Sequence, residues 1–208
     1  MKITKLVHSC LLVEMPERTA LFDPGVMSEG MVNVDSLQYL DDIIITHEHA
    51  DHISMDLMKR LVQKFPDVRV TAPTSFETEL EQNGITIKQG VEGIELFEAP
   101  HEKVEPMFPH PDNIGVHYLD LLTHPGDSHH FDSTKAVLAL PVQAPWGATV
   151  EAVNLALRLQ PKFIVPIHDW HWSDDARNMT YDGLEELFGQ KGITFVKAVN
   201  GEAFNLDV

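Results

Sequence analysis

The stretch Ile43-Ile44-Ile45-Thr46-His47-Glu48-His49-Ala50-Asp51-His52 joins an apolar run to a hexapeptide with three imidazoles and two carboxylates. Imidazole nitrogen and carboxylate oxygen suit zinc, manganese, iron and nickel, and neither group alone selects among these metals. In an extended or tightly turned segment, side chains two residues apart point the same way. We therefore expect His47, His49 and Asp51 to converge while His52 turns aside. A loop of this form can supply ligands to two neighbouring metal positions.

Size and composition narrow the class of protein. The 208 residues predict a single domain over 1–208, because a chain of this length can bury a large core. No apolar stretch approaches the roughly 18 residues of a membrane span, and the N-terminus lacks the features of a signal peptide. The single cysteine, Cys10, excludes an internal disulfide and a cysteine-type zinc site, and its apolar neighbours predict a buried side chain.

The formal net charge of −17 argues against nucleic acid as a partner, because proteins that bind nucleic acids normally present a basic surface. We expect a cytoplasmic protein that acts on a small-molecule substrate and has no membrane partner. The sequence leaves open whether the protein is a monomer or a homo-oligomer.

Short strands alternate with helices along the chain, which predicts an α/β fold. The isoleucine-rich run at 42–46 predicts a buried strand, and the apolar stripe at 54–65 predicts a helix capped by Ser54. Other strands are expected over 2–7, 10–13, 20–22, 68–71, 85–88, 94–98, 115–122, 136–140, 163–167, 193–199 and 202–206, and other helices over 74–83, 149–159 and 183–188.

Three later segments repeat the order seen at 43–52, in which an apolar strand leads into a residue that can bind metal. The residues are His101 after 94–98, the group His124-Pro125-Gly126-Asp127-Ser128 after 115–122 and His168 after 163–167. Strand ends suit a rigid site, because the sheet fixes the backbone that presents the ligands. This argument favours His101 over His110, which lies within the proline-rich loop at 100–113 and stays the alternative.

The motif His-x-His-x-Asp-His at 47–52 and the later residues resemble the metallo-β-lactamase fold superfamily of metal-dependent hydrolases, over nearly the whole chain. The resemblance implies a four-layer αββα sandwich. In that family the later ligands are a single histidine, an aspartate within a Gly-Asp-Ser/Thr turn and a final histidine, and these positions fall on His101, Asp127 and His168. Asp23 matches a family aspartate that is ordinarily structural.

Within that superfamily, His8-Ser9 and Pro166-Ile167-His168 are similar to the ascorbate-6-phosphate lactonase-like group of small hydrolases. Glu102 departs from this group, whose members commonly have a small hydroxyl residue after the third ligand.

The resemblance implies a site for two divalent metal ions, zinc in the first place and manganese, iron or nickel as alternatives. His47, His49 and His101 would hold one ion, Asp51, His52 and His168 the other, and Asp127 would bridge them. A hydroxide bridging the two metals would cleave a small lactone, ester or phosphoester, and Asp51 would orient it as the catalytic residue. The residues that bind the substrate, and the substrate itself, are not predicted.

Several alternatives compete with this interpretation. Thioesterases of the glyoxalase II kind usually add a C-terminal helical domain, and only 40 residues (169–208) follow His168. RNA nucleases or phosphodiesterases of the same fold generally add domains or basic surfaces. The negative net charge of the chain argues against this class. Diiron redox relatives replace the second motif histidine by a carboxylate, so His49 favours hydrolysis. A metal-stabilised ligand-binding protein without activity is the non-enzymatic alternative.

The other histidines are expected to have supporting roles. His8 should support the site, and His117 should be a hydrogen-bonded structural residue within a strand. One of the three histidines His124, His129 and His130 should orient a ligand or contact substrate. Trp146 is expected either to wall the pocket or to pack in the core, and no role is assigned to His171.

Overall fold

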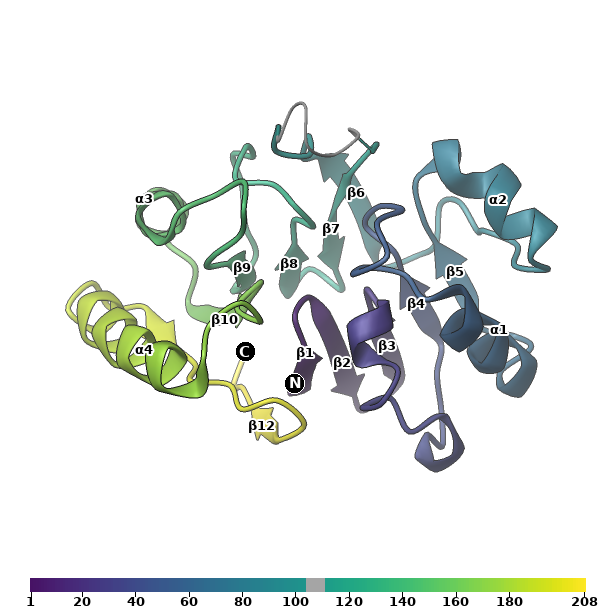
Figure 1. The fold of residues 1–208 in the computed structure, drawn as a ribbon, viewed down its shortest axis with the longest axis horizontal. Coiled ribbons are helices and arrows are strands. Elements are labelled where there is room, and N and C mark those ends of the chain that lie inside the picture. Colours follow the sequence, from purple (N-terminus) through teal and green to yellow (C-terminus); the bar gives the residue numbers. More distant parts are fainter. Residues whose placement is uncertain (104–110) are drawn as a thin grey trace. The chain divides into compact units, whose positions relative to one another are not determined.

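The computed structural model describes residues 1–103 and 111–208 of the chain. These residues separate into two compact units, with unit 1 formed by 1–92 and 200–207 and unit 2 by 93–199 and 208. Each unit contains one six-stranded sheet and its own helices (Figure 1). No helix among the described residues is long and apolar enough to cross a membrane.

Unit 1 is built on a sheet with the strand order β12-β1-β2-β3-β4-β5. Strands β1, β2 and β3 form an antiparallel meander, β12 pairs antiparallel with β1, and β4 and β5 extend the other side in parallel. The strands are β1 (Lys2–Val7), β2 (Cys10–Met15), β3 (Arg18–Phe22), β4 (Asp42–Ile44), β5 (Arg69–Thr71) and β12 (Ala203–Asn205). The helices are η1 (Val26–Ser28), η2 (Val34–Ser36), α1 (Met55–Lys64), η3 (Thr74–Phe76) and α2 (Glu77–Gln82).

Helix α1 shows why this sequence forms its local structure. It begins after Ser54, whose hydroxyl accepts a hydrogen bond from the backbone N–H of Leu57 at 3.2 Å, as the cap of a helix does. Its buried side chains recur at helical spacing and belong to one hydrophobic cluster with residues of β4 and β5. The packing of α1 on the sheet fixes the end of β4, which leads into the histidine-rich motif.

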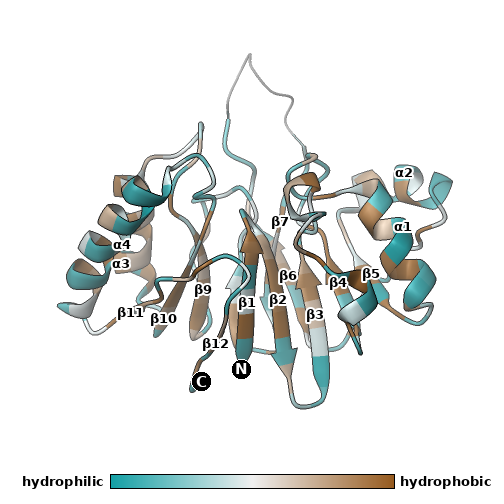
Figure 2. Ribbon diagram, turned by 60° about the horizontal axis from the view of Figure 1, so that its bottom comes forward, coloured by the Kyte–Doolittle hydropathy of each residue, from teal (hydrophilic) through white to brown (hydrophobic). Residues whose placement is uncertain are grey.

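Unit 2 is built on a sheet with the order β11-β10-β9-β8-β7-β6, in which β8 to β11 run parallel and β6 and β7 pair antiparallel. The strands are β6 (Ile94–Glu98), β7 (Ile114–Tyr118), β8 (Leu122–His124), β9 (Val137–Pro141), β10 (Phe163–Ile167) and β11 (Thr194–Phe195). Helices α3 (Thr149–Leu159) and α4 (Asp174–Gly189) bury apolar side chains in one cluster with β9 and β10. Figure 2 shows the hydrophobic strands β9 and β10 and the mixed hydropathy of α3 and α4.

Two predicted strands are wrong. The segment 115–122 is not continuous, because the chain turns at Leu119 and Asp120, both in the left-handed region with φ of 50° and 57°. The turn separates β7 from β8 and allows them to pair antiparallel. The segment 85–88 forms no regular strand and is tied to β5 by the single bridge between Ile87 and Val70.

The predicted short helix at 183–188 is also wrong in extent, since α4 begins at Asp174. Ser173 caps it by accepting a hydrogen bond from the backbone N–H of Ala176 at 3.3 Å, and two acidic residues occupy its first turn. Both features favour an earlier start, because side-chain oxygens and negative charge stabilise the N-terminus of a helix.

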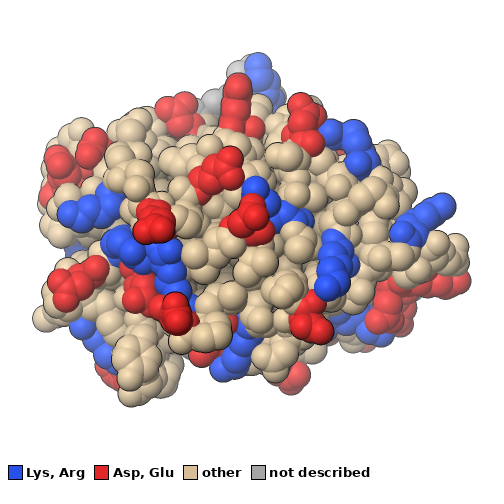
Figure 3. Space-filling view, turned by 180° about the vertical axis from the view of Figure 1, so that it is seen from behind, with Lys and Arg blue, Asp and Glu red and all other residues tan. Residues whose placement is uncertain are grey.

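Each unit contains a mixed sheet and its helices, which confirms the predicted α/β class. The single domain over 1–208 stays a prediction. Figure 3 shows basic and acidic side chains intermixed on the face it presents, without a continuous basic field on that face.

Candidate metal centre

The motif at 47–52 forms a tight turn after β4 in unit 1. The backbone N–H groups of His52 and Ile53 both donate to the carbonyl oxygen of His49, at 2.8 and 3.0 Å. The carbonyl oxygen of Ala50 accepts from the backbone N–H of Val26 at 2.8 Å. The motif is therefore held both by its own turn and by the segment that follows β3.

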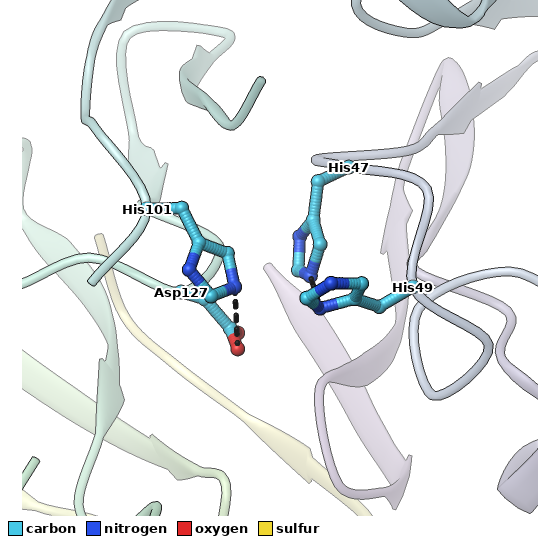
Figure 4. Close-up of side chains that lie close together, drawn as sticks. All are labelled: His47, His49, His101 and Asp127. Carbon is cyan, nitrogen blue, oxygen red and sulfur yellow. Dashed lines mark hydrogen bonds and ion pairs between the residues drawn. The ribbon is translucent and has the colours of Figure 1, made fainter. Parts of the chain in front are cut away.

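The imidazoles of the motif lie against one another. His47 Nε2 and His49 Nδ1 are 3.2 Å apart, and Figure 4 marks this contact with a dashed line. The expectation that His52 turns aside is wrong, since its ring centroid lies 3.9 Å from that of His47. The turn at His49 brings His52 back because it reverses the chain within three residues.

Asp23 fixes this arrangement from the end of β3. It is fully buried and accepts three hydrogen bonds, from the backbone N–H of Thr46 (2.8 Å), from the Thr46 hydroxyl (2.8 Å) and from His52 Nδ1 (2.7 Å). An ionised carboxylate only accepts, so Nδ1 of His52 carries the proton and Nε2 keeps its lone pair. Histidines that bind metal have this pattern, in which the second ring nitrogen donates to a carboxylate or carbonyl. Asp23 thus has the expected structural role.

His8 contacts the carboxylate that the sequence assigns as catalytic. Its Nε2 lies 3.0 Å from Oδ2 of Asp51, and its side chain is buried. His8 occupies the turn between β1 and β2 with φ of 57°, in the left-handed region, and Asp23 has φ of 42°. The expected supporting role of His8 therefore takes the form of a contact that orients Asp51.

Gly25 allows the segment after β3 to approach the motif. A Cβ atom at this position would lie 1.9 Å from the carbonyl oxygen of Asp51 and 2.8 Å from the backbone nitrogen of His52. Only glycine fits, because both neighbours belong to the backbone and cannot rotate away. This close approach was not predicted from the sequence.

Unit 2 brings together the other three predicted ligands. Oδ1 of Asp127 lies 2.6 Å from His168 Nε2, and Oδ2 lies 3.5 Å from His101 Nε2 (Figure 4 shows the second pair). Each carboxylate oxygen therefore faces one imidazole. Nδ1 of His101 donates to the carbonyl oxygen of Glu102 at 2.6 Å, a contact that fixes the orientation of the ring. His110 lies outside the described residues, so the preference for His101 stays a prediction.

The loop that presents Asp127 is held by a buried asparagine. Oδ1 of Asn113 accepts from the backbone N–H of Asp127 at 3.1 Å, and its amide donates to the carbonyl oxygens of Ala99 (2.6 Å) and Pro125 (2.8 Å). Gly126 adopts the left-handed conformation with φ of 60° and donates to His124 Nδ1 at 3.3 Å. His124 thus supports the loop. Sequence reasoning missed Asn113, which carries no local signal beyond its place before a strand.

His168 also has left-handed backbone geometry, with φ of 63°. The next residue, Asp169, is fully buried and accepts from Tyr181 Oη at 2.6 Å and from Arg177 Nε at 2.8 Å. The pKa of Tyr181 is raised, mainly because the phenol is buried and also because Asp169 is negatively charged. Both donors belong to α4, so the helix anchors the end of β10 that presents His168. Sequence reasoning missed Arg177 and Tyr181 because it began α4 too late.

Trp146 lines a pocket beside Asp127. Its Nε1–H donates to Oδ2 of Asp127 at 2.9 Å, and the pocket has a volume of about 370 Å³. The other lining residues are Glu102, His129, His130, Glu151, Asn154, Leu155 and Arg158. Of the two roles expected for Trp146, the structure shows the pocket wall.

The remaining predictions concern single residues. His117 is a hydrogen-bonded structural residue as predicted, with Nδ1 2.9 Å from the Thr123 hydroxyl, and burial is the main cause that lowers its pKa. Cys10 is buried as predicted, and burial raises the pKa of its thiol. His129 donates from Nε2 to the carbonyl oxygen of Pro141 at 2.8 Å, and the exposed His130 pairs with Glu102 at 2.8 Å.

The chain is similar to several known proteins. The family model described as the Beta-lactamase superfamily domain matches residues 2–168. Protein Rv0786c of Mycobacterium tuberculosis is 31% identical over 199 residues, which cover 90% of this chain and 92% of that protein. Igni18, a metallo hydrolase from Ignicoccus hospitalis, is 19% identical with a TM-score of 0.73 and 99% coverage of both chains.

A further solved structure with this fold is CmlA, a diiron β-hydroxylase from Streptomyces venezuelae. It is 14% identical with a TM-score of 0.64, and the match covers 99% of this chain and 54% of CmlA. These matches confirm the predicted metallo-β-lactamase fold.

Proposed function

Because the chain belongs to the family of the Beta-lactamase superfamily domain, we propose that it is a hydrolase that depends on two divalent metal ions, with zinc in the first place. The observation that carries the proposal is the arrangement of Asp127. Its oxygens lie 2.6 Å from His168 and 3.5 Å from His101, one oxygen to each histidine. A carboxylate placed in this way can offer one oxygen to each of two ions.

His47, His49 and His101 would hold one ion, Asp51, His52 and His168 would hold the other, and Asp127 would serve both. The chemistry of the donors supports this set, because imidazole and carboxylate are ligands of divalent zinc. The hydrogen bonds of His52 and His101 support it as well, since each ring pairs through Nδ1 with an oxygen, as one ring nitrogen of a metal-binding histidine usually does.

When bound, two divalent ions would lower the pKa of a shared water and polarise the scissile oxygen of the substrate. Asp51 would accept a hydrogen bond from that water and so orient its attack on the substrate. Nε2 of His8 lies 3.0 Å from Oδ2 of Asp51, a contact that helps to fix the direction of this carboxylate. Hydrolysis of this kind needs no covalent intermediate on the protein.

The substrate we propose is a small lactone, ester or phosphoester, bound next to Trp146. The mixed lining of the pocket, with carboxylates, imidazoles, an arginine and an indole, supports a small polar molecule. We also place the chain near the ascorbate-6-phosphate lactonase-like group and in the cytoplasm. The acidic balance supports a substrate other than nucleic acid.

The test combines two ligand variants with a matched control from the same loop. We expect His49→Ala and Asp127→Ala to lower the metal content per chain and to abolish hydrolysis of a lactone, ester and phosphodiester panel, while circular dichroism shows a folded protein. Glu48→Ala changes an exposed residue between two ligands and should keep both metal content and activity.

Metal contents equal to the wild type in both ligand variants would overturn the assignment of the site. Bound iron together with oxygen consumption, in place of hydrolysis, would overturn the proposed reaction. Bound metal without turnover on the whole panel would favour the ligand-binding alternative.

A further inference from the structure

Trp146 contacts the three predicted metal ligands of unit 2. It lies between β9 and α3, and its Nε1–H donates to Oδ2 of Asp127 at 2.9 Å. Its ring centroid is 5.4 Å from that of His168, at an interplanar angle of 62°, and 6.5 Å from that of His101, at 59°. One indole therefore adjoins the full set of donors that unit 2 supplies.

The hydrogen bond from Trp146 orients the carboxylate of Asp127. The terminal torsion of an aspartate is broad, so its carboxylate plane is not fixed by rotamer preference alone. An indole N–H only donates, and a bond from it to an ionised oxygen is charge-assisted and directional. The bond at Oδ2 sets the plane of the carboxylate and turns Oδ1 toward His168, 2.6 Å away.

We propose that Trp146 is a positioning residue, which presets Asp127 for metal binding before the metal arrives. This role rests on the proposed function, because Asp127 is taken to bridge the two ions. Trp146 does not bind metal itself, since the indole nitrogen offers no lone pair. Its effect is to hold the two oxygens of Asp127 in different directions, one for each histidine.

The decisive variant is Trp146→Phe, which keeps an aromatic ring in the half-buried site and removes the N–H donor together with part of the ring system. We expect its zinc affinity, measured by competition with a chromophoric chelator, to fall about 10- to 100-fold, as is typical when the partner of a metal ligand is removed. Trp172→Phe is the matched control, because Trp172 packs against Tyr181 in the core of unit 2 and should keep wild-type affinity.

A second measurement uses the metal-free protein. The indole N–H resonances of ¹⁵N-tryptophan-labelled protein are assigned by their loss in the Phe variants. We expect Asp127→Ala to shift the resonance of Trp146 and to leave that of Trp172 in place. A Trp146 resonance that does not move would overturn the positioning role, because the hydrogen bond would then be absent.

The outcomes separate the two proposals. Wild-type protein that binds no zinc would overturn the proposed function, and the role of Trp146 with it. Wild-type protein that binds zinc, with equal affinity in Trp146→Phe, would overturn only the role of Trp146. A lower unfolding free energy in Trp146→Phe without any loss of zinc affinity would also overturn it, since the residue would then act on stability alone.

Discussion

Among single substitutions near the motif, we expect Asp23→Ala to cause the largest loss of stability. The side chain is fully buried, and Asp23→Ala removes the acceptor of its three hydrogen bonds, two from Thr46 and one from His52. A buried donor left without its partner costs about 1–3 kcal/mol. We therefore expect the free energy of unfolding to fall by about 3–9 kcal/mol, a large share of the 5–15 kcal/mol that is typical of a folded protein.

The assay is urea unfolding of the metal-free protein, followed by circular dichroism. Asp67→Ala changes an exposed carboxylate and should stay within about 0.5 kcal/mol of the wild type. Asp23→Asn keeps the size and one acceptor oxygen, so its loss should lie between these values, at about 1–3 kcal/mol for weakened charge-assisted bonds. A loss below about 1 kcal/mol for Asp23→Ala would refute the reasoning, because the hydrogen bonds would then contribute little.

Two further predictions follow from single residues. Gly25→Ala places a Cβ 1.9 Å from the Asp51 carbonyl oxygen and should lower the free energy of unfolding in urea by about 1–3 kcal/mol. Gly30→Ala is the control, because a Cβ there has nothing within 4 Å, and it should lower this free energy much less. Equal losses in the two variants would contradict the close approach. Burial and Asp169 raise the pKa of Tyr181, so its contribution to stability is complete below about pH 10, the pKa of an unfolded tyrosine, and is lost as the pH rises further. Tyr181→Phe should remove this part of the alkaline decline in unfolding free energy, and an unchanged decline would contradict the assignment.

The elements predicted most accurately from the sequence are those whose hydrophobic periodicity agrees with their burial. The predicted bounds of the helix at 149–159 and of the strand at 163–167 match α3 and β10. The strand at 115–122 was wrong because its interruption at Leu119 and Asp120 uses left-handed residues other than glycine, which leave no clear signal. The start of α4 was missed because its first half is polar, and its burial is concentrated in Tyr181, Leu184 and Phe188.

The candidate site was predictable in its donors and not in their supports. The motif at 47–52 follows an apolar run, so its local sequence indicated metal binding, whereas Asp127 was assigned from its position in the family pattern. Asn113, Tyr181 and Trp146 act through hydrogen bonds to residues 12 or more positions away, namely Pro125, Asp169 and Asp127. Such partners follow from the folded chain, because no spacing rule relates a residue to a contact made across a loop.

His8 and His168 share the left-handed backbone described above, which costs a residue other than glycine about 1–3 kcal/mol. Glycine would relieve this backbone cost at each position and would delete the imidazole placed there. Backbone strain and chemistry therefore make opposite demands on these two positions. Selection for heat resistance alone would favour glycine, so any such screen has to include metal binding as a second criterion.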